Sequence, residues 1–172
     1  MANNLTEQAL QIAKAIQDEF PRLGVPPDEG MAPQSQQVLP QSFVRGTKGY
    51  IEHVAFQING CYEHGWFDAC AVMIRRLVET LIIEAFESHG IAEKIKKPNG
   101  DFLYLSDLID RTLTETAWNL SRKTKTALPR LKVVGDSSAH SRRFVAHRSD
   151  IDRRQEDLRV AVQELVYVAG LK

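Results

Sequence analysis

The chain has 172 residues, 43% of them hydrophobic, which is enough to bury one good core but too few for two large ones. Lysine plus arginine and aspartate plus glutamate number 22 each, so the overall charge gives no reason to expect a nucleic-acid or membrane partner. No run of about 18 uncharged apolar residues occurs. We therefore expect a compact, single-core protein without a membrane-spanning helix.

An N-terminal helix and a proline-rich connector are expected ahead of the main domain. Apolar side chains recur at helical spacing from Leu5 to Phe20, and Pro21 ends the pattern. Residues 21–46 are rich in proline, glycine, glutamine and serine, a composition that disfavours regular structure. The expected organisation is therefore a helix at 1–20, a connector at 21–46 that either wraps the core or is mobile, and a main domain at 47–172.

The cellular compartment is expected to be the cytoplasm. Charged side chains interrupt the first 19 residues, so we expect no secretion signal there. The two cysteines, Cys61 and Cys70, lack the spacing of a disulfide framework, which suits a reducing compartment. We expect both thiols to serve packing.

Residues 47–172 are expected to form an all-helical bundle. Apolar residues recur at the three-and-four spacing of a helix with one buried face. The segments with this pattern are 48–63, 66–88, 102–113 and 150–169. The segment 66–88 is the most hydrophobic and is predicted to be the central helix, and no alternating run competes for a strand.

Several helix ends can be predicted from single residues. Gly65 is expected to allow a sharp turn between the first two helices of the bundle, and Gly170 to end the last helix. Asp150 is expected to cap the last helix. Because Pro129 lacks a backbone donor, the segment from residue 118 onward can form either one bent helix or two short ones.

The predicted helix 66–88 carries a polar stripe on an otherwise apolar surface. Steps of seven and four residues place Asp68, Arg75 and Glu79 on nearly one line, with Arg76 beside them. Because a buried charge is costly unless it is paired, these side chains either form a structural network or line a site. Arg75 before Glu79 is the weaker orientation of a helical ion pair, so we expect a cross-helix partner for Arg75.

The most informative motif is the hexad Gly-Asp-Ser-Ser-Ala-His at residues 135–140, in which either Asp136 or His140 could be the cross-helix partner of Arg75. It resembles the ribonuclease signature of the HEPN superfamily, in which an Arg is followed five places later by a His. Gly135 occupies the place of that Arg. A Gly followed by Asn or Asp and closing on Ala-His is similar to domain of unknown function 4145, a HEPN-like family.

The resemblance covers about residues 50–171 and includes the block that contains Arg75, Arg76 and Glu79. It implies a HEPN-like bundle of four to five core helices, with the N-terminal helix and connector outside it. It also implies a homodimer in which two motifs face one cleft, and a link to phage defence through restriction or other defence proteins. No metal and no cofactor are expected.

If the hexad is catalytic, RNA is cut by attack of its own ribose hydroxyl, with His140 as the proton carrier and a cation on the phosphate. Because Gly135 is not an Arg, another side chain has to supply that cation. The candidates are Lys132, Arg75, Arg142 and Arg143. A second pair with the same spacing, Arg142 and His147, is expected in the loop before the last helix.

If the hexad is structural, His140 closes its helix by hydrogen bonding to the carboxylate of Asp136 or Glu79, and Asp136 can also serve as a cap. The hexad is then a packing signature of the bundle. Because the Arg is missing, we favour this interpretation, or a binding role, over cleavage.

Charge is unevenly distributed along the chain. Residues 121–160 hold eleven Lys or Arg against five Asp or Glu, whereas the rest of the chain holds eleven against seventeen. Such an excess can attract phosphates to one face, although a solvated helix surface carries similar charge.

Two other patterns do not support a site. The Gly-Asp-Ser block at 135–137 is similar to a serine esterase motif, but too little chain follows it for the sheet and distant His of such an enzyme. Cys61, His64, His53 and Cys70 could be assembled into a zinc site, but no second close pair supports one.

We therefore expect a non-catalytic helical module that binds RNA, a nucleotide or a protein partner. The alternative is a weak metal-independent endoribonuclease that uses His140 with a substitute Arg.

Overall fold

The computed structural model describes Gln11 and residues 37–172. The chain divides into two compact units, residues 1–31 and 32–172, and every element named below belongs to the second. The predicted N-terminal helix, apart from the helical Gln11, and most of the predicted connector lie outside the described residues.

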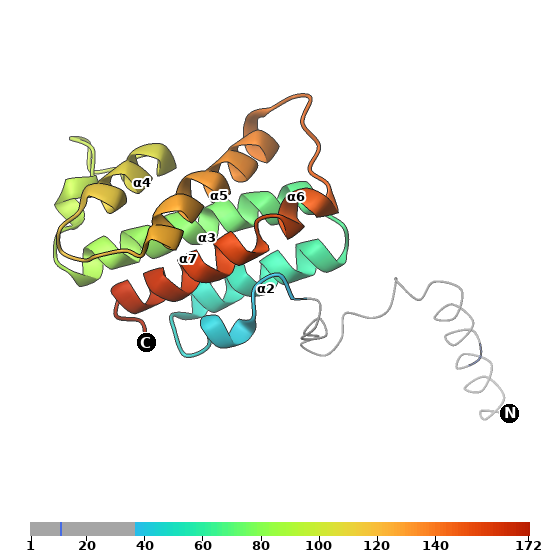
Figure 1. Ribbon diagram of the computed structural model, residues 1–172, viewed down its shortest axis with the longest axis horizontal. Coiled ribbons are helices and arrows are strands. Elements are labelled where there is room, and N and C mark those ends of the chain that lie inside the picture. The colour runs from blue at the N-terminus through green and yellow to red at the C-terminus, as the bar shows by residue number, and fades with distance from the viewer. Residues whose placement is uncertain (1–10, 12–36) are drawn as a thin grey trace, which may run out of the picture. The chain divides into compact units, whose positions relative to one another are not determined.

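The described part of the second unit is all-helical, as predicted, and contains no strand (Figure 1). The longer helices are α2 (Gly49–Glu63), α3 (Phe67–Ser88), α4 (Leu105–Thr114), α5 (Arg122–His140) and α7 (Gln155–Val168). The shorter helices are η2 (Gln41–Phe43), η3 (Ala92–Ile95) and α6 (Arg148–Asp152). Within residues 37–172, no helix has the length and apolar character needed to cross a membrane.

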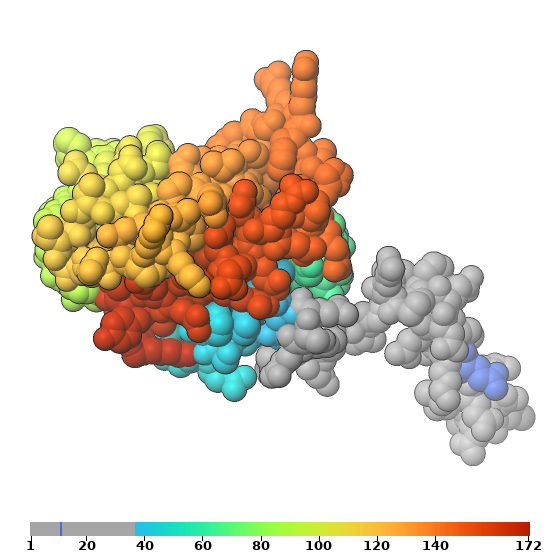
Figure 2. Space-filling model, in the orientation of Figure 1, coloured from blue at the N-terminus to red at the C-terminus, as the bar shows by residue number. Residues whose placement is uncertain are grey.

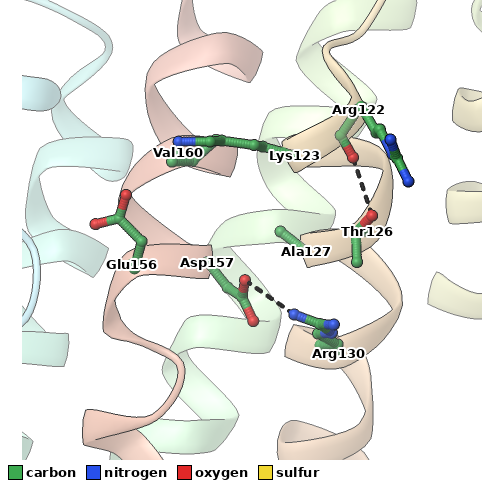
Figure 3. Close-up of a pocket in the computed structure, with 8 residues that line it drawn as sticks. All are labelled: Arg122, Lys123, Thr126, Ala127, Arg130, Glu156, Asp157 and Val160. Atoms are coloured by element: carbon green, nitrogen blue, oxygen red, sulfur yellow. Dashed lines mark hydrogen bonds and ion pairs between the residues drawn. The ribbon is translucent and has the colours of Figure 1, made fainter.

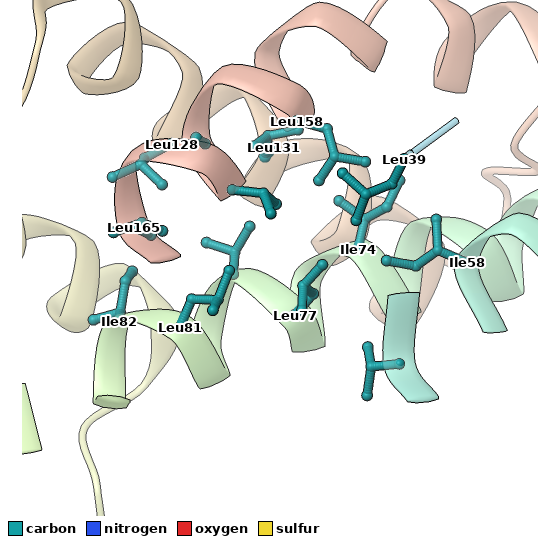
Figure 4. Close-up of a cluster of buried hydrophobic side chains, with 14 of the residues drawn as sticks. Leu39, Ile58, Ile74, Leu77, Leu81, Ile82, Leu128, Leu131, Leu158 and Leu165 are labelled. Atoms are coloured by element: carbon teal, nitrogen blue, oxygen red, sulfur yellow. The ribbon is translucent and has the colours of Figure 1, made fainter. Parts of the chain in front are cut away.

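Helix α3 is the central element, as its hydrophobic pattern predicts. It packs against α2, α4, α5 and α7, and its apolar side chains meet leucines from α5 and α7 in the core (Figure 4). Cys70 is one of its fully buried side chains, and burial raises the pKa of this thiol to about 12. The thiol therefore stays protonated and serves packing, as expected.

The predicted glycine turns end α2 and α7. Gly65 has φ +75°, and the amide of Trp66 donates to the carbonyl of Cys61 at 2.8 Å, which is the pattern of a Schellman turn. Gly170 has φ +62° and closes the end of α7 in the same way. A residue with a Cβ is strained at such a φ, so glycine fixes both turns.

The predicted start of the fourth helix at residue 102 is wrong by three residues. Helix α4 begins at Leu105, because the residues before it pair in an extended conformation with the end of η3. The amide of Leu103 donates to the carbonyl of Ile95 at 2.9 Å, and Phe102 forms an isolated bridge with Lys96. A tertiary contact therefore overrides the helical pattern at these positions.

Helix α5 is one helix with Pro129 inside it, which settles the choice between one helix and two. The side chain of Pro129 is exposed, whereas Leu128 and Leu131 beside it are buried in the core, so core packing offsets the lost hydrogen bond. The helix begins at Arg122, not near residue 118, because the hydroxyl of Ser121 caps it by accepting from the amide of Thr124 at 3.2 Å.

The predicted last helix is divided into α6 and α7. Asp150 is not its cap: His147 is the N-terminal cap of α6, and the Asp150 carboxylate accepts a hydrogen bond from the His147 amide at 2.9 Å. This is the back-bonding half of a capping box: the helix begins three residues earlier than predicted, and Asp150 stabilises its start as the third helical residue.

Residues 37–46, which end the predicted connector, pack on the bundle. Val38, Leu39 and Val44 are at most 1% exposed. The side chain of Asn59 in α2 pairs with both backbone groups of Leu39, at 3.0 and 2.8 Å. This stretch therefore belongs to the core, and the bundle begins before residue 47.

Candidate functional site

The hexad forms the last six residues of α5, where α5 crosses α3. Gly135 is buried at this crossing, and a Cβ built on it would lie 2.5 Å from the Cβ of Arg75. Real Cβ atoms do not approach so closely, so only glycine allows the two helices to meet here. The space that a side chain at position 135 would need is therefore filled by the aliphatic part of the Arg75 side chain.

Asp136 binds Arg75, as predicted for a cross-helix partner. The Nε of Arg75 donates to a carboxylate oxygen of Asp136 at 2.8 Å, and Lys132, one turn earlier on α5, contacts the other oxygen. The Nη1 of Arg75 also lies 3.4 Å from Glu79. Burial alone would raise the pKa of Asp136, but the hydrogen bonds from Lys132 and Arg75 outweigh it and lower this pKa below its usual value.

The remaining members of the predicted polar stripe do not join this network. Asp68, in the first turn of α3, accepts a hydrogen bond from the backbone amide of Ala146 at 3.1 Å. Arg76 is exposed and makes no hydrogen bond or ion pair with any described residue. The stripe therefore has three uses: a helix-to-helix network, an anchor for the segment after α5, and a free surface cation.

His140 is not tied to a carboxylate, so the expected bond to Asp136 or Glu79 is absent. It is the last residue of α5, its side chain is exposed, and it makes no side-chain hydrogen bond within the described residues. Asp136, one turn away, is already occupied by Arg75 and Lys132. Asp136 is also not a cap, because it lies inside α5.

Residues 141–147, which we call the basic loop, connect α5 to α6. They contain Arg142 and Arg143 and no acidic residue, and His147 ends them, so the second Arg-and-His pair lies in a loop as predicted. The loop extends beyond the helices and forms a projection on the surface (Figures 1 and 2). The side chains of Arg142 and Arg143 are exposed and pair with no carboxylate in the described part of the chain.

Both ends of the basic loop are fixed. The hydroxyl of Ser141 accepts a hydrogen bond from the amide of Phe144 at 3.2 Å, and the Ala146 amide is held by Asp68. Arg148, directly after the loop, stacks on the ring of Tyr62 with its guanidinium carbon 4.7 Å from the ring centre. Contacts at both ends therefore hold the loop that carries the two arginines.

A cavity of about 350 Å³ lies between α5 and α7, away from the hexad (Figure 3). Its lining residues are Arg122, Lys123, Thr126, Ala127, Arg130, Glu156, Asp157 and Val160. Cations come from α5 and carboxylates from α7, and Arg130 lies 3.7 Å from Asp157. Because the two walls carry opposite charge, this cavity attracts phosphate less than the basic loop does.

Two features near the basic loop were not predicted from the sequence. Trp66, expected to begin a helix, is instead the cap residue of α3 and is 61% exposed. Arg148 was not singled out, because its contact with Tyr62 joins residues 86 positions apart. A large aromatic residue directly after a turn glycine was the one signal that could have drawn attention to Trp66.

Among the described residues, no three His, Cys, Asp or Glu side chains gather in a group that could hold a metal ion. Comparison of the chain with protein-family models, with curated proteins and with solved structures found no match.

Proposed function

We propose that this chain is a non-catalytic, HEPN-like helical module, similar to domain of unknown function 4145, that binds RNA through the basic loop. The observation that carries the proposal is the pair Arg142 and Arg143, exposed on a projecting loop without a carboxylate partner among residues 37–172. Paired surface cations lose much of their attraction for phosphate, whereas unpaired ones keep it. An Arg guanidinium also matches the two oxygens of a phosphate.

The geometry around the hexad favours binding over cleavage. Arg75, the cation nearest to Gly135, donates its Nε to Asp136 and lies with its Nη1 3.4 Å from Glu79, so two carboxylates already offset its charge and weaken its attraction for a phosphate. The His140 side chain makes no hydrogen bond to an acid or base among the described residues, and general acid–base cleavage of RNA needs proton carriers that are held in place. These features support a structural role for the hexad, which joins α3 and α5, and a binding role for the basic loop.

The alternative of a weak metal-independent endoribonuclease has one supporting feature. His140 is exposed and only two residues from Arg142, so a substitute Arg lies near it in sequence. The homodimer implied by the resemblance is a separate proposal. If sedimentation shows a monomer at micromolar concentration, a mechanism in which the motifs of two protomers share one cleft is excluded.

The proposal is tested by equilibrium binding of a fluorescent RNA at several salt concentrations, without metal ions. Arg142→Gln/Arg143→Gln should weaken binding and flatten the salt dependence by roughly 1.4 units of log-log slope, since each of the two phosphate contacts on a single strand contributes about 0.7. The control, Arg122→Gln/Lys123→Gln, removes the same charge at the other end of α5, about 27 Å away at 1.5 Å per residue.

Binding that is equal in both double variants, or no RNA binding by the wild type, contradicts the proposal. Gel analysis of the same samples distinguishes RNA binding from RNA cleavage. Cleavage that is present in the wild type and lost in His140→Ala would make the protein a ribonuclease. Intact RNA with both proteins agrees with a binding module. If the wild type binds no RNA, a protein partner becomes the better candidate ligand.

A further inference from the structure

We propose that Trp66 is a stacking platform for an unpaired RNA base, so that the ligand of the basic loop is single-stranded RNA. This inference rests on the proposed function and adds to it a residue and a substrate class. A Trp that exposes 61% of its surface is unusual, because burial of so large an apolar side chain is favourable.

The backbone of Trp66 is held in place on both sides. Its amide closes the Schellman turn at the end of α2, and its carbonyl accepts from the amide of Cys70 at 2.9 Å in the first turn of α3. In such a turn, the side chain at this position often packs on the residue five places earlier, here Cys61. Trp66 instead stays 61% exposed, although these hydrogen bonds fix its backbone.

A second aromatic ring supports the exposed indole. The ring of His64 lies 5.0 Å from the ring of Trp66, centre to centre, and is tilted by 30°. Two aromatic rings at this distance and tilt are in stacking contact, which favours the observed position of the indole. Holding the indole in one orientation lowers the entropy that it loses when a base stacks on it.

Trp66 and the basic loop lie at the same end of the bundle. Asp68, two residues after Trp66, holds the loop through the Ala146 amide. Tyr62, which stands edge-on to Phe67 at 5.9 Å, carries the guanidinium of Arg148 on its face. Figure 1 shows the turn between α2 and α3 beside α6 and the descending part of the loop. Two independent contacts therefore tie the aromatic turn to the cationic loop.

An aromatic platform beside a cationic strip is the arrangement that binds single strands. The arginines can follow the phosphates, whereas the ring needs an open base face, and a duplex hides its base faces in the stack. Every base has such a face, so this arrangement predicts little sequence preference. The charge of Trp66 is zero, so its contribution should not depend on salt.

The test compares a fluorescent single-stranded RNA of 12 nucleotides with a fluorescent hairpin duplex of the same charge. Trp66→Ala should weaken single-strand binding about tenfold, in line with one base–aromatic stack, and leave duplex binding unchanged. The salt dependence should be unchanged as well. Trp66→Phe keeps a ring and should retain most of the affinity. Circular dichroism checks that both variants are folded.

Tryptophan fluorescence gives a second measurement. The single strand should quench the emission of the wild type, and this quenching should disappear in Trp66→Phe, because the other tryptophan, Trp118, packs against Phe86 at 4.9 Å. Equal single-strand affinity in wild type and Trp66→Ala would overturn the platform while leaving RNA binding by Arg142 and Arg143 intact. Failure of both RNAs to bind would instead overturn the proposed function together with the platform.

Discussion

Replacing Gly135 by Ala tests the role of the hexad as a helix contact. The added Cβ would lie 2.5 Å from the Cβ of Arg75 and 3.1 Å from its Cγ and Cδ. Carbon atoms in good contact lie about 3.5–4.0 Å apart, so α3 and α5 have to separate by roughly 1 Å. Because both atoms at the closest contact are bonded directly to the backbone, no change of side-chain rotamer removes the overlap.

The magnitude follows from two opposing terms. Overpacking of this kind costs about 1–3 kcal/mol, and the upper part of that range applies to a contact between two Cβ atoms. The better helix propensity of Ala returns about 1 kcal/mol. We expect Gly135→Ala to lower the free energy of unfolding by about 1–2 kcal/mol, which lowers Tm by roughly 3–6 °C in a protein of this size.

The assay is urea unfolding followed by circular dichroism, with Gly60→Ala as the matched control. Gly60 also lies inside a helix, but a Cβ there would meet nothing within 4 Å. This control should be more stable than the wild type by about 0.5–1 kcal/mol. In an Arg75→Gly background, the cost of Gly135→Ala should largely disappear. If Gly135→Ala is as stabilising as Gly60→Ala, the close approach of the helices does not require glycine.

Two further predictions concern the same contact. Gly135→Arg, which restores the Arg of the resembling signature, should destabilise the protein at least as much as Gly135→Ala and give no metal-free RNA cleavage; a gain of cleavage would contradict this. The folded-state pKa of Asp136 is lowered, so its stabilisation is complete above the unfolded pKa near 3.9 and is lost as the pH falls through the lower folded value. Asp136→Asn should therefore cost about 1 kcal/mol at pH 7 and progressively less below about pH 4, in urea titrations over that range; a constant difference would refute the assignment.

The sequence predicted the helices where local signals and tertiary contacts agree. Helices α2 and α3 begin and end within one residue of the prediction, because an apolar period and a turn glycine mark the same limits. The start of α4 was missed, since Leu103 bonds to Ile95 and no local pattern shows that pairing. The division of α6 from α7 was missed for a related reason: the apolar positions continue across the break.

The candidate site was predictable only in part. The weak orientation of Arg75 and Glu79 correctly predicted a partner on another helix, and Asp136 is that partner. The reason for glycine at position 135 could not be found, because it depends on which side chain of α3 lies opposite. The expected bond of His140 was wrong, because Asp136 was already used by two cations.

The packing of residues 37–46 has a consequence for the order in which the fold is completed. Arg159 in α7 donates to the carbonyls of Val38 and Gln37 at 3.0 and 2.8 Å, and Lys172 donates to that of Ser42 at 2.6 Å. These bonds join positions 121 to 130 residues apart. Closing such long loops is entropically costly and slow. A ribosome makes this segment early, and Leu39 can pair with Asn59 soon afterwards. Its bonds to Arg159 and Lys172 cannot form until α7 has been made, so an early-synthesised part of the core is among the last to be fully secured.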